Sequence, residues 1–220
     1  MPRTAILLLE RLIKAAPVLT PRRPSQIDYA RMLRSQRDRL HEIADELARG
    51  EITPRQWGER FQQILIDGHT ESWTLGRQRA GDLSGPTIDD FLVGIARADG
   101  DAQYLLAFID DIEGDRYRRD DGSLKVGAVK ARANLYVGKM RGTAGEAFVE
   151  TSEDEEEFNW VLSAVENHCS DCPELALLSP FTKDTAFAHP GDGSTPCLGN
   201  CLCHWVRASD GIEGFKPVEL

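Results

Sequence analysis

The sequence predicts a mainly α-helical protein, built of elongated helical hairpins and closed by a small C-terminal α+β module. Apolar residues recur at spacings of three and four over much of residues 25–150. Ser25, Thr53 and Thr87 each precede such a segment as helix caps. All five cysteines lie between residues 168 and 204, which predicts a zinc-stapled module. We therefore expect a basic arm in residues 1–24, a helical domain in 25–150 and a cysteine-rich module in 151–220.

The composition is that of a soluble globular protein, with 41% hydrophobic and 28% charged residues. The net charge of −10 argues against a protein that coats nucleic acid. The charge is unevenly placed, because residues 1–40 hold nine basic and three acidic side chains while the remainder holds 17 and 33. A basic first segment suggests a contact with an acidic partner, and the alternative is a solvated helix face.

The N-terminal apolar run, residues 5–9, is too short to span a bilayer, and Glu10 and Arg11 interrupt it. It also lacks the continuous core and cleavage site of a signal peptide. We therefore expect a cytosolic protein without a membrane contact. In a reducing compartment, clustered cysteines favour a metal over disulfides.

Local signals place the first helices. Residues 4–16 predict a short amphipathic helix, and the prolines of 17–24 predict an extended linker. The capping pattern at 25–28 begins a long helix that stops at Gly50. Thr53-Pro54 begins the next helix, and the short connection predicts an antiparallel hairpin. Its expected buried face is Trp57, Phe61, Ile64, Leu65 and Trp73.

Two further helices are expected after the break at 81–86. The third helix should be weakened or interrupted at 99–101. Its inward-facing residues before that point are expected to be Ile88, Phe91, Leu92 and Ile95. The same face should continue after it with Tyr104, Leu105, Phe108, Ile109 and Ile112. The fourth spans residues 123–149 after a charged loop at 110–122. Gly138, Gly142 and Gly145 lie on successive turns of it, which suggests either close approach by another backbone or a kinked helix.

The cysteines form two pairs. Cys169 and Cys172 are a C-x₂-C pair, and Cys197 and Cys201 are a C-x₃-C pair. Thiolates at such spacings can turn toward one ion, and tetrahedral Zn²⁺ takes four of them. Our first choice of ligands is therefore these four residues. Cys203 could replace Cys197, because residues 201 and 203 share one face of an extended strand.

The surrounding residues leave alternatives open. His204 is a further candidate ligand, whereas His168 and His189 are expected at the surface or beside the ligands. The 24 residues between Cys172 and Cys197 show no periodic core pattern. A loop of this length needs a crosslink to be ordered, which favours a structural metal. Disulfides and free buried thiols are the alternatives.

An enzyme is the competing interpretation of the same residues. Catalytic zinc sites keep an open position, whereas four thiolates would close the coordination shell. The chain has no nucleophile-elbow, P-loop or H-E-x-x-H motif. Weaker alternatives are a Cys169 nucleophile and Mg²⁺ bound by the paired aspartates at 89–90, 110–111 and 120–121. The sequence therefore favours a protein without catalytic residues.

Three stretches, in this order, carry a family resemblance. The first is Leu-Ala-Arg-Gly-Glu-Ile-Thr-Pro-Arg-Gln-Trp at 47–57, followed by His69 and by Leu-Gly-Arg at 75–77. The second is Arg-Ala-Asn-Leu-Tyr at 132–136, running to Met-Arg at 140–141. The third runs from Trp-Val-Leu at 160–162 to the C-x₂-C pair and closes with Cys-Leu-Gly-Asn-Cys-Leu-Cys at 197–203.

Over residues 30–205 the chain thus resembles the tailed-phage minor head, or head morphogenesis, proteins, to which the phage Mu minor head protein belongs. That family often ends in His-Pro-x-Cys-Arg-Cys, whereas here residues 189–190 stand apart from the cysteines and Leu202 replaces the Arg. The resemblance implies a non-enzymatic structural protein that assists head assembly.

The same resemblance implies the partners and the location. The partners would be the portal and the major capsid or scaffold proteins, and the basic N-terminus could reach packaged DNA. The protein would lie in the virion, inside the capsid or at the portal vertex, after passing through the host cytoplasm. The rival functions are a zinc-dependent nuclease or DNA-processing protein, and a zinc-containing protein-interaction or regulatory module.

Overall fold

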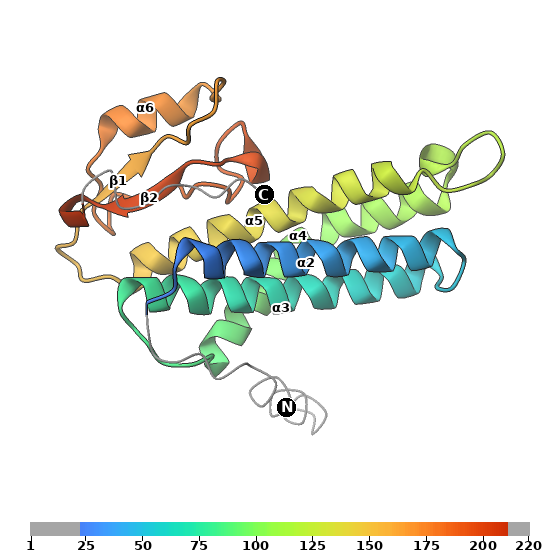
Figure 1. Ribbon diagram of the computed structural model, residues 1–220, viewed down its shortest axis with the longest axis horizontal. Coiled ribbons are helices and arrows are strands. Elements are labelled where there is room, and N and C mark those ends of the chain that lie inside the picture. The colour runs from blue at the N-terminus through green and yellow to red at the C-terminus, as the bar shows by residue number, and fades with distance from the viewer. Residues whose placement is uncertain (1–22, 211–220) are drawn as a thin grey trace.

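A computed structural model describes residues 23–210, which form a long helical bundle with a small α+β module on its side near one end (Figure 1). The bundle consists of α2 (Gln26–Ala48), α3 (Pro54–Ala80), α4 (Ile88–Glu113) and α5 (Val126–Thr151). The mainly helical fold class is confirmed. The helix expected in residues 4–16 lies outside the described residues, and so does the basic arm apart from Arg23 and Pro24.

Three helices begin where the sequence predicts them, because each cap satisfies backbone N–H groups locally. Ser25 Oγ accepts from the Asp28 N–H at 3.3 Å, and the Asp28 carboxylate accepts from the Ser25 N–H at 2.8 Å. The same reciprocal pattern joins Thr53 to Gln56, and Thr87 to Asp90. The chain turns after α2 at Gly50, whose φ of 73° is in the left-handed region.

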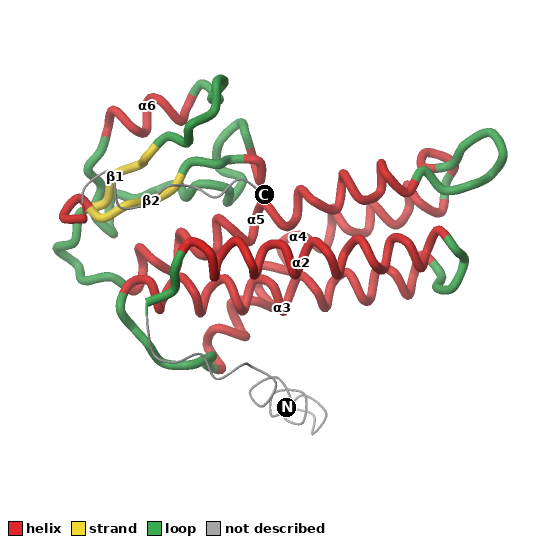
Figure 2. Tube along the Cα trace, in the orientation of Figure 1, coloured by secondary structure: helices red, strands yellow, loops and turns green. Residues whose placement is uncertain are grey.

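The four helices run in alternating directions, and α3 contacts each of the other three (Figure 2). It packs against α2, α4 and α5, and α2 also packs against α5. Trp57 and Phe61 of α3 meet Phe108 of α4 and Tyr136 of α5 in the middle of the core, with ring centroids 4.9–6.2 Å apart. These aromatic side chains and the aliphatic residues around them form one buried cluster, whose removal from water stabilises the bundle.

The predicted buried face of α4 is wrong at three positions, and the predicted interruption at 99–101 is absent. The helix runs unbroken from Ile88 to Glu113. Ile88, Leu92 and Tyr104 are 55%, 49% and 53% exposed. The first half turns small and acidic residues toward its neighbours instead, and larger apolar side chains follow: Asp90, Gly94, Ala98, Asp101, Leu105, Phe108 and Ile112.

Close packing and ion pairing explain this face of α4. A Cβ at Gly94 would lie 2.7 Å from the Ile66 carbonyl oxygen, so only glycine lets α4 approach α3 there. The buried Asp90 carboxylate accepts two hydrogen bonds from the Arg77 guanidinium, at 2.7 and 2.6 Å, and a third from Thr74 Oγ1 at 2.9 Å. Asp101 pairs with Lys139 of α5. Hydrophobic periodicity does not register such contacts.

The module begins after α5. Strands β1 (Phe158–Val161) and β2 (His204–Arg207) pair antiparallel, with Trp160 opposite Trp205. The segment between the cysteine pairs has more structure than expected. It contains α6 (Asp171–Leu178), and Phe181 forms a bridge with Phe158, exchanging two backbone hydrogen bonds of 2.7 and 2.8 Å.

Buried apolar side chains form two clusters, one in the bundle and one in the module. The second contains Phe158, Trp160, Phe181 and Trp205 together with three of the cysteines. Phe148 and Val149 of α5 also belong to it, so the last turns of that helix are part of the module's core. Within the described residues, no helix combines the length and the hydrophobicity needed to cross a membrane.

Candidate metal centre

Five thiols meet on the side of the module that faces α5. Cys172 lies in the first turn of α6, with Cys169 just before this helix. Cys197 and Cys201 flank the short 3₁₀ helix η2 (Leu198–Asn200), and Cys203 precedes β2. Cys172, Cys201 and Cys203 are buried, whereas Cys169 and Cys197 are partly exposed. All five are free thiols.

The sulfur atoms form two groups that overlap at one atom. Within the first group, the Cys169 sulfur is 3.3 Å from those of Cys172 and Cys197, which are 3.8 Å from each other. The second group is Cys172, Cys201 and Cys203, whose sulfurs all lie within 4.8 Å of one another. Cys172 and Cys201 are 3.6 Å apart. The structure therefore brings all five predicted ligand cysteines together.

These separations suit a metal ion. With Zn–S bonds of about 2.3 Å, two sulfurs of a tetrahedral site are roughly 3.8 Å apart. The sulfur pairs of the first group and the Cys172–Cys201 pair, at 3.3–3.8 Å, are close to that edge. Disulfides are much shorter, with sulfurs about 2.05 Å apart. The cysteines thus lie close enough to hold a metal ion, and their all-sulfur chemistry matches a soft divalent cation.

The close packing of the thiols gives them different pKa values. A hydrogen bond with Cys203 and burial both raise the pKa of the Cys201 thiol, whereas the hydrogen bond from Cys201 lowers the pKa of Cys203 to about 5. Burial raises the pKa of Cys172 above that of an ordinary thiol. Five adjacent thiols, three of them buried, cannot all ionise without a cation, because each thiolate disfavours ionisation of its neighbours.

The three nearby histidines differ in their roles. His168 lies beside the second group, with its Nδ1 3.9 Å from the Cys203 sulfur. His189 is buried and accepts a hydrogen bond from the Trp205 indole N–H at 3.1 Å. Burial lowers the pKa of His189 to about 4, so it is neutral near pH 7. His204, a further candidate in the sequence, is buried in β2 and belongs to neither sulfur group.

Glycines fix the cysteine region against α5, as one of the two sequence interpretations predicts. A Cβ at Gly138 would lie 2.6 Å from the Gly199 carbonyl carbon, and a Cβ at Gly142 would lie 2.5 Å from Asp192 Cα. Gly145 differs, because a Cβ there would make an ordinary 3.5 Å contact with Trp205. Arg141, which lies next to Gly142 on α5, adds a polar contact, because its guanidinium donates a hydrogen bond to the Cys201 carbonyl at 3.0 Å.

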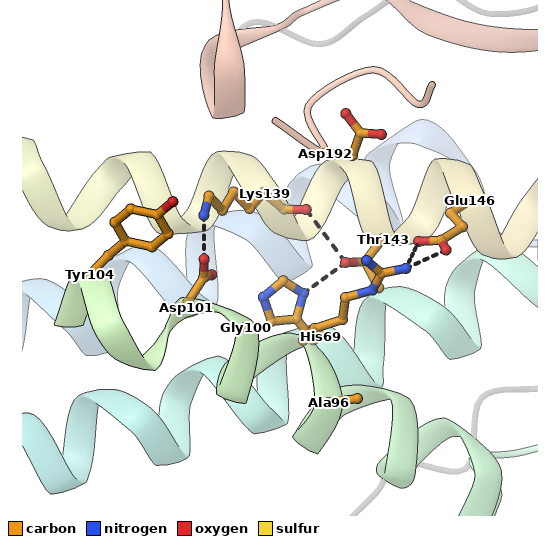
Figure 3. A pocket seen from close by; sticks show the side chains of 10 residues that line it. His69, Ala96, Gly100, Asp101, Tyr104, Lys139, Thr143, Glu146 and Asp192 are labelled. Carbon is orange, nitrogen blue, oxygen red and sulfur yellow. Dashed lines mark hydrogen bonds and ion pairs between the residues drawn. The ribbon is translucent and has the colours of Figure 1, made fainter. Parts of the chain in front are cut away.

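The bundle offers a second candidate site, a cavity of about 230 Å³ near the module (Figure 3). Sequence reasoning does not predict it, because its residues come from three helices and a loop. They are mostly polar, and they are His69, Ala96, Arg97, Gly100, Asp101, Tyr104, Lys139, Thr143, Glu146 and Asp192. Its charged side chains are largely neutralised in pairs, since Lys139 binds Asp101 and Arg97 binds Glu146.

His69 is the cavity's unusual residue. Its Nδ1 is hydrogen-bonded to Thr143 Oγ1 at 2.8 Å, whereas its buried Nε2 has no hydrogen-bond partner. Figure 3 shows that Nε2 points toward Asp101. Burial lowers the pKa of His69 to about 3, so the ring is neutral. The cavity is therefore lined mainly by polar side chains and has room for a small molecule.

Comparisons with known proteins do not assign either site. No family model, no curated protein and no solved structure matches this chain.

Proposed function

We propose that this chain is a non-enzymatic minor capsid or head morphogenesis protein of a tailed phage or prophage, which binds the portal or the inner capsid during head assembly. The three sequence stretches that resemble this family are distant along the chain but adjacent in the fold. The first lies largely on α3 and the second on α5, which pack together. The third contributes the module, whose Gly199 contacts α5 at Gly138. This common packing is the observation that supports the proposal.

The individual residues of these stretches also support a structural role. Trp57 is fully buried in the bundle core. A Cβ at Gly76 would lie 2.6 Å from the Ala147 Cβ, so this glycine lets α3 approach α5. Arg77 holds the start of α4 through the buried Asp90 carboxylate. These residues secure helix packing, and none of them presents a reactive group to an open surface.

We assign the metal centre of this protein to Zn²⁺ with a structural role. The thiols come from both ends of a 24-residue segment whose own secondary structure consists mainly of α6. A cation shared by them would tie α6, η2 and the start of β2 into one unit. Since Cys201 accepts a hydrogen bond from Arg141, the same unit would be fixed to α5. The module would then present a rigid surface to a partner.

The deciding experiment is to isolate particles. The phage or prophage that encodes this chain is induced, and procapsids and mature heads are separated on a density gradient. Quantitative mass spectrometry should find the chain in procapsids, at a few copies per portal ring. A head protein of known copy number serves as the internal standard. Absence of the chain from both kinds of particle would reject the proposal.

The alternative function, a zinc-dependent nuclease, can be tested by a DNA cleavage assay. Among the described residues, groups of three or more metal-ligating side chains occur only at the cysteines. Asp90 and Asp111, from two of the acidic pairs, are instead bound by arginines. Purified protein should therefore leave supercoiled and linear DNA intact with added Mg²⁺ or Zn²⁺. Cleavage that disappears in a Cys172→Ser variant would favour the nuclease.

The basic segment at 1–24 supplies a separate test of partner binding. If it reaches the portal, scaffold or packaged DNA, a chain lacking these residues should enter procapsids less efficiently. Circular dichroism of the truncated chain checks that the helical bundle is still folded. A matched variant with the segment's Arg and Lys residues replaced by Gln separates charge from length. Unchanged incorporation of both variants would refute this contact.

A further inference from the structure

Five thiols and one imidazole are more donors than a single tetrahedral ion can use. One ion at the first group would take Cys169, Cys172 and Cys197, with Cys201 as the nearest fourth sulfur. That arrangement leaves Cys203 unused, although it is 2% exposed and lies against the other thiols. A single ion therefore leaves Cys203, and the His168 ring beside it, without a metal to bind.

The overlap of the two groups at Cys172 gives these two side chains a role. Each group has three sulfurs within 4.8 Å of one another, and only Cys172 is common to both. A thiolate sulfur has enough lone pairs to bind two cations at once. Two ions on one sulfur, each about 2.3 Å from it, fall within the roughly 3.5–4 Å separation seen in other two-metal sites.

We propose that the cysteine cluster holds two divalent zinc ions bridged by the Cys172 sulfur. The first ion is bound by Cys169, Cys172 and Cys197, and the second by Cys172, Cys201, Cys203 and His168. This inference rests on the structural metal centre proposed above and assigns two ions to it instead of one.

The second ion has three buried sulfur ligands within 4.8 Å of one another, and the His168 ring, which contacts only the Cys203 sulfur, would move toward them to supply the fourth. Cys172, Cys201 and Cys203 are all at most 2% exposed, and His168 Nδ1 is 3.9 Å from the Cys203 sulfur. Three sulfurs and one imidazole nitrogen are a standard tetrahedral zinc shell. The backbone supports it, because the Cys201 carbonyl is held by Arg141 of α5. This ion would be buried and slow to exchange.

The first ion has three protein sulfurs and a fourth position. Cys169 and Cys197 are partly exposed, so a water molecule can complete its shell. Thr195 Oγ1 lies 3.2 Å from the Cys197 sulfur and borders this position. The first ion should therefore exchange faster than the second and take up added thiol or imidazole ligands.

Charge balance favours two ions over one. One Zn²⁺ bound by four thiolates would carry a net charge of −2, with the fifth cysteine a neutral thiol, whereas two Zn²⁺ ions bound by five thiolates carry −1. Uncompensated buried charge is strongly unfavourable. The Arg141 guanidinium bonded to the Cys201 carbonyl is a cation close enough to offset the remainder.

The test is to count metals on the full-length chain, expressed with zinc and without a histidine tag, then passed over chelating resin. Native mass spectrometry and elemental analysis for Zn and Fe are expected to give two Zn per chain. Cys203→Ser and His168→Ala should each lower this to one, as should Cys197→Ser. His41→Ala is the matched control, because His41 bonds Asn134 on the bundle, and it should retain two.

The outcomes separate this inference from the proposed centre itself. One Zn in the wild type overturns the second ion and leaves a single-ion centre standing. No bound zinc, or bound iron in its place, overturns both. If Cys203→Ser fails to fold by circular dichroism, His168→Ala, which changes a partly exposed side chain, gives the same count.

Cobalt substitution tests the bridge directly. A thiolate shared by two high-spin Co²⁺ ions couples their spins antiferromagnetically, so the paramagnetic resonance signal per cobalt should fall as the second equivalent binds. A signal that grows in proportion to bound cobalt would show two independent sites and would overturn the bridge.

Discussion

Replacing Gly142 by Ala tests how the module is docked on α5. The new methyl group would lie 2.5 Å from Asp192 Cα and 2.7 Å from the Gly191 carbonyl carbon. Ordinary carbon–carbon contacts are about 3.5–4.0 Å, so the loop backbone must retreat by roughly 1 Å. Backbone atoms cannot rotate away as a flexible side chain would. The loop would have to move as a unit, together with the neighbouring η2 and Cys201.

The expected loss follows from two opposing effects. Overpacking a close contact costs about 1–3 kcal/mol, whereas Ala in place of Gly inside a helix gains about 1 kcal/mol. We therefore expect Gly142→Ala to lower the free energy of unfolding by up to about 2 kcal/mol. Gly145→Ala is the matched control in the same helix, because its Cβ would lie 3.5 Å from Trp205. That variant should gain up to about 1 kcal/mol from helix propensity.

The assay is urea unfolding followed by circular dichroism, at fixed protein and zinc concentrations because bound metal adds to apparent stability. The two variants should differ by the overpacking cost alone, about 1–3 kcal/mol. Hydrogen exchange should show faster exchange of residues 191–199 in Gly142→Ala alone. Equal stability of the two variants would refute docking through direct backbone contact.

Three further predictions concern the ion pair, the buried histidine and the metal. Asp90→Asn should cost about 1.5–3 kcal/mol in urea unfolding, because the neutral amide weakens the buried hydrogen bonds to Arg77 and leaves that guanidinium with only the partly exposed Asp82 carboxylate. The exposed neighbour variant Asp89→Asn should change stability by less than about 0.5 kcal/mol, and equal effects would contradict this reasoning. The pKa of His69 is about 3 in the folded protein and near 6.5 unfolded, so the unfolded chain binds the extra proton. Stability should therefore be complete above pH 6.5 and fall by up to about 1.4 kcal/mol per pH unit from there toward pH 3. His69→Gln should show a shallower fall, and parallel curves would count against the assignment. Removal of metal by a chelator should raise hydrogen exchange mainly after residue 158, with α2–α5 still protected. Uniform exchange over the whole chain would argue against a local structural role for the metal.

Local signals predict the bundle well because they act within one turn of chain. The caps at Ser25, Thr53 and Thr87 are set by side chains three residues apart, so the sequence contains all the information they require. The buried stripe of α3 is also correct, since Trp57, Phe61 and the following aliphatic residues face one core. The approach of another backbone to Gly138 and Gly142 is one of two outcomes that the glycine spacing allows.

Leu105, Phe108 and Ile112 are buried as predicted, but the inward face of α4 before them could not be found in this way, because its contacts are long-range. Gly94 faces inward because the backbone of α4 lies close to α3 at this position. Asp101 faces inward because it forms an ion pair with Lys139 of α5. A hydropathy pattern assigns both residues to the solvent. It therefore places the exposed Ile88 and Leu92 in the core.

The candidate site was partly accessible from the sequence. The cysteine spacing identifies the five thiols but not their division into two groups around Cys172, which depends on how α6 and η2 meet. The same holds for His168, whose distance to the Cys203 sulfur is set by the tertiary fold. The cavity beside His69 leaves no linear signal, because α3, α4 and α5 contribute its walls.

The glycine contact between α5 and the module also restricts how this chain can change in length. Gly138 and Gly142 are one helical turn apart, and each faces a different part of the loop, at Gly199 and at Asp192. One inserted residue between them would rotate the rest of α5 by about 100° and advance it by about 1.5 Å. The second glycine would then miss the loop, and a side chain would occupy the contact. Insertions and deletions should therefore be tolerated in the turns at the far end of the bundle but not within this single turn of α5.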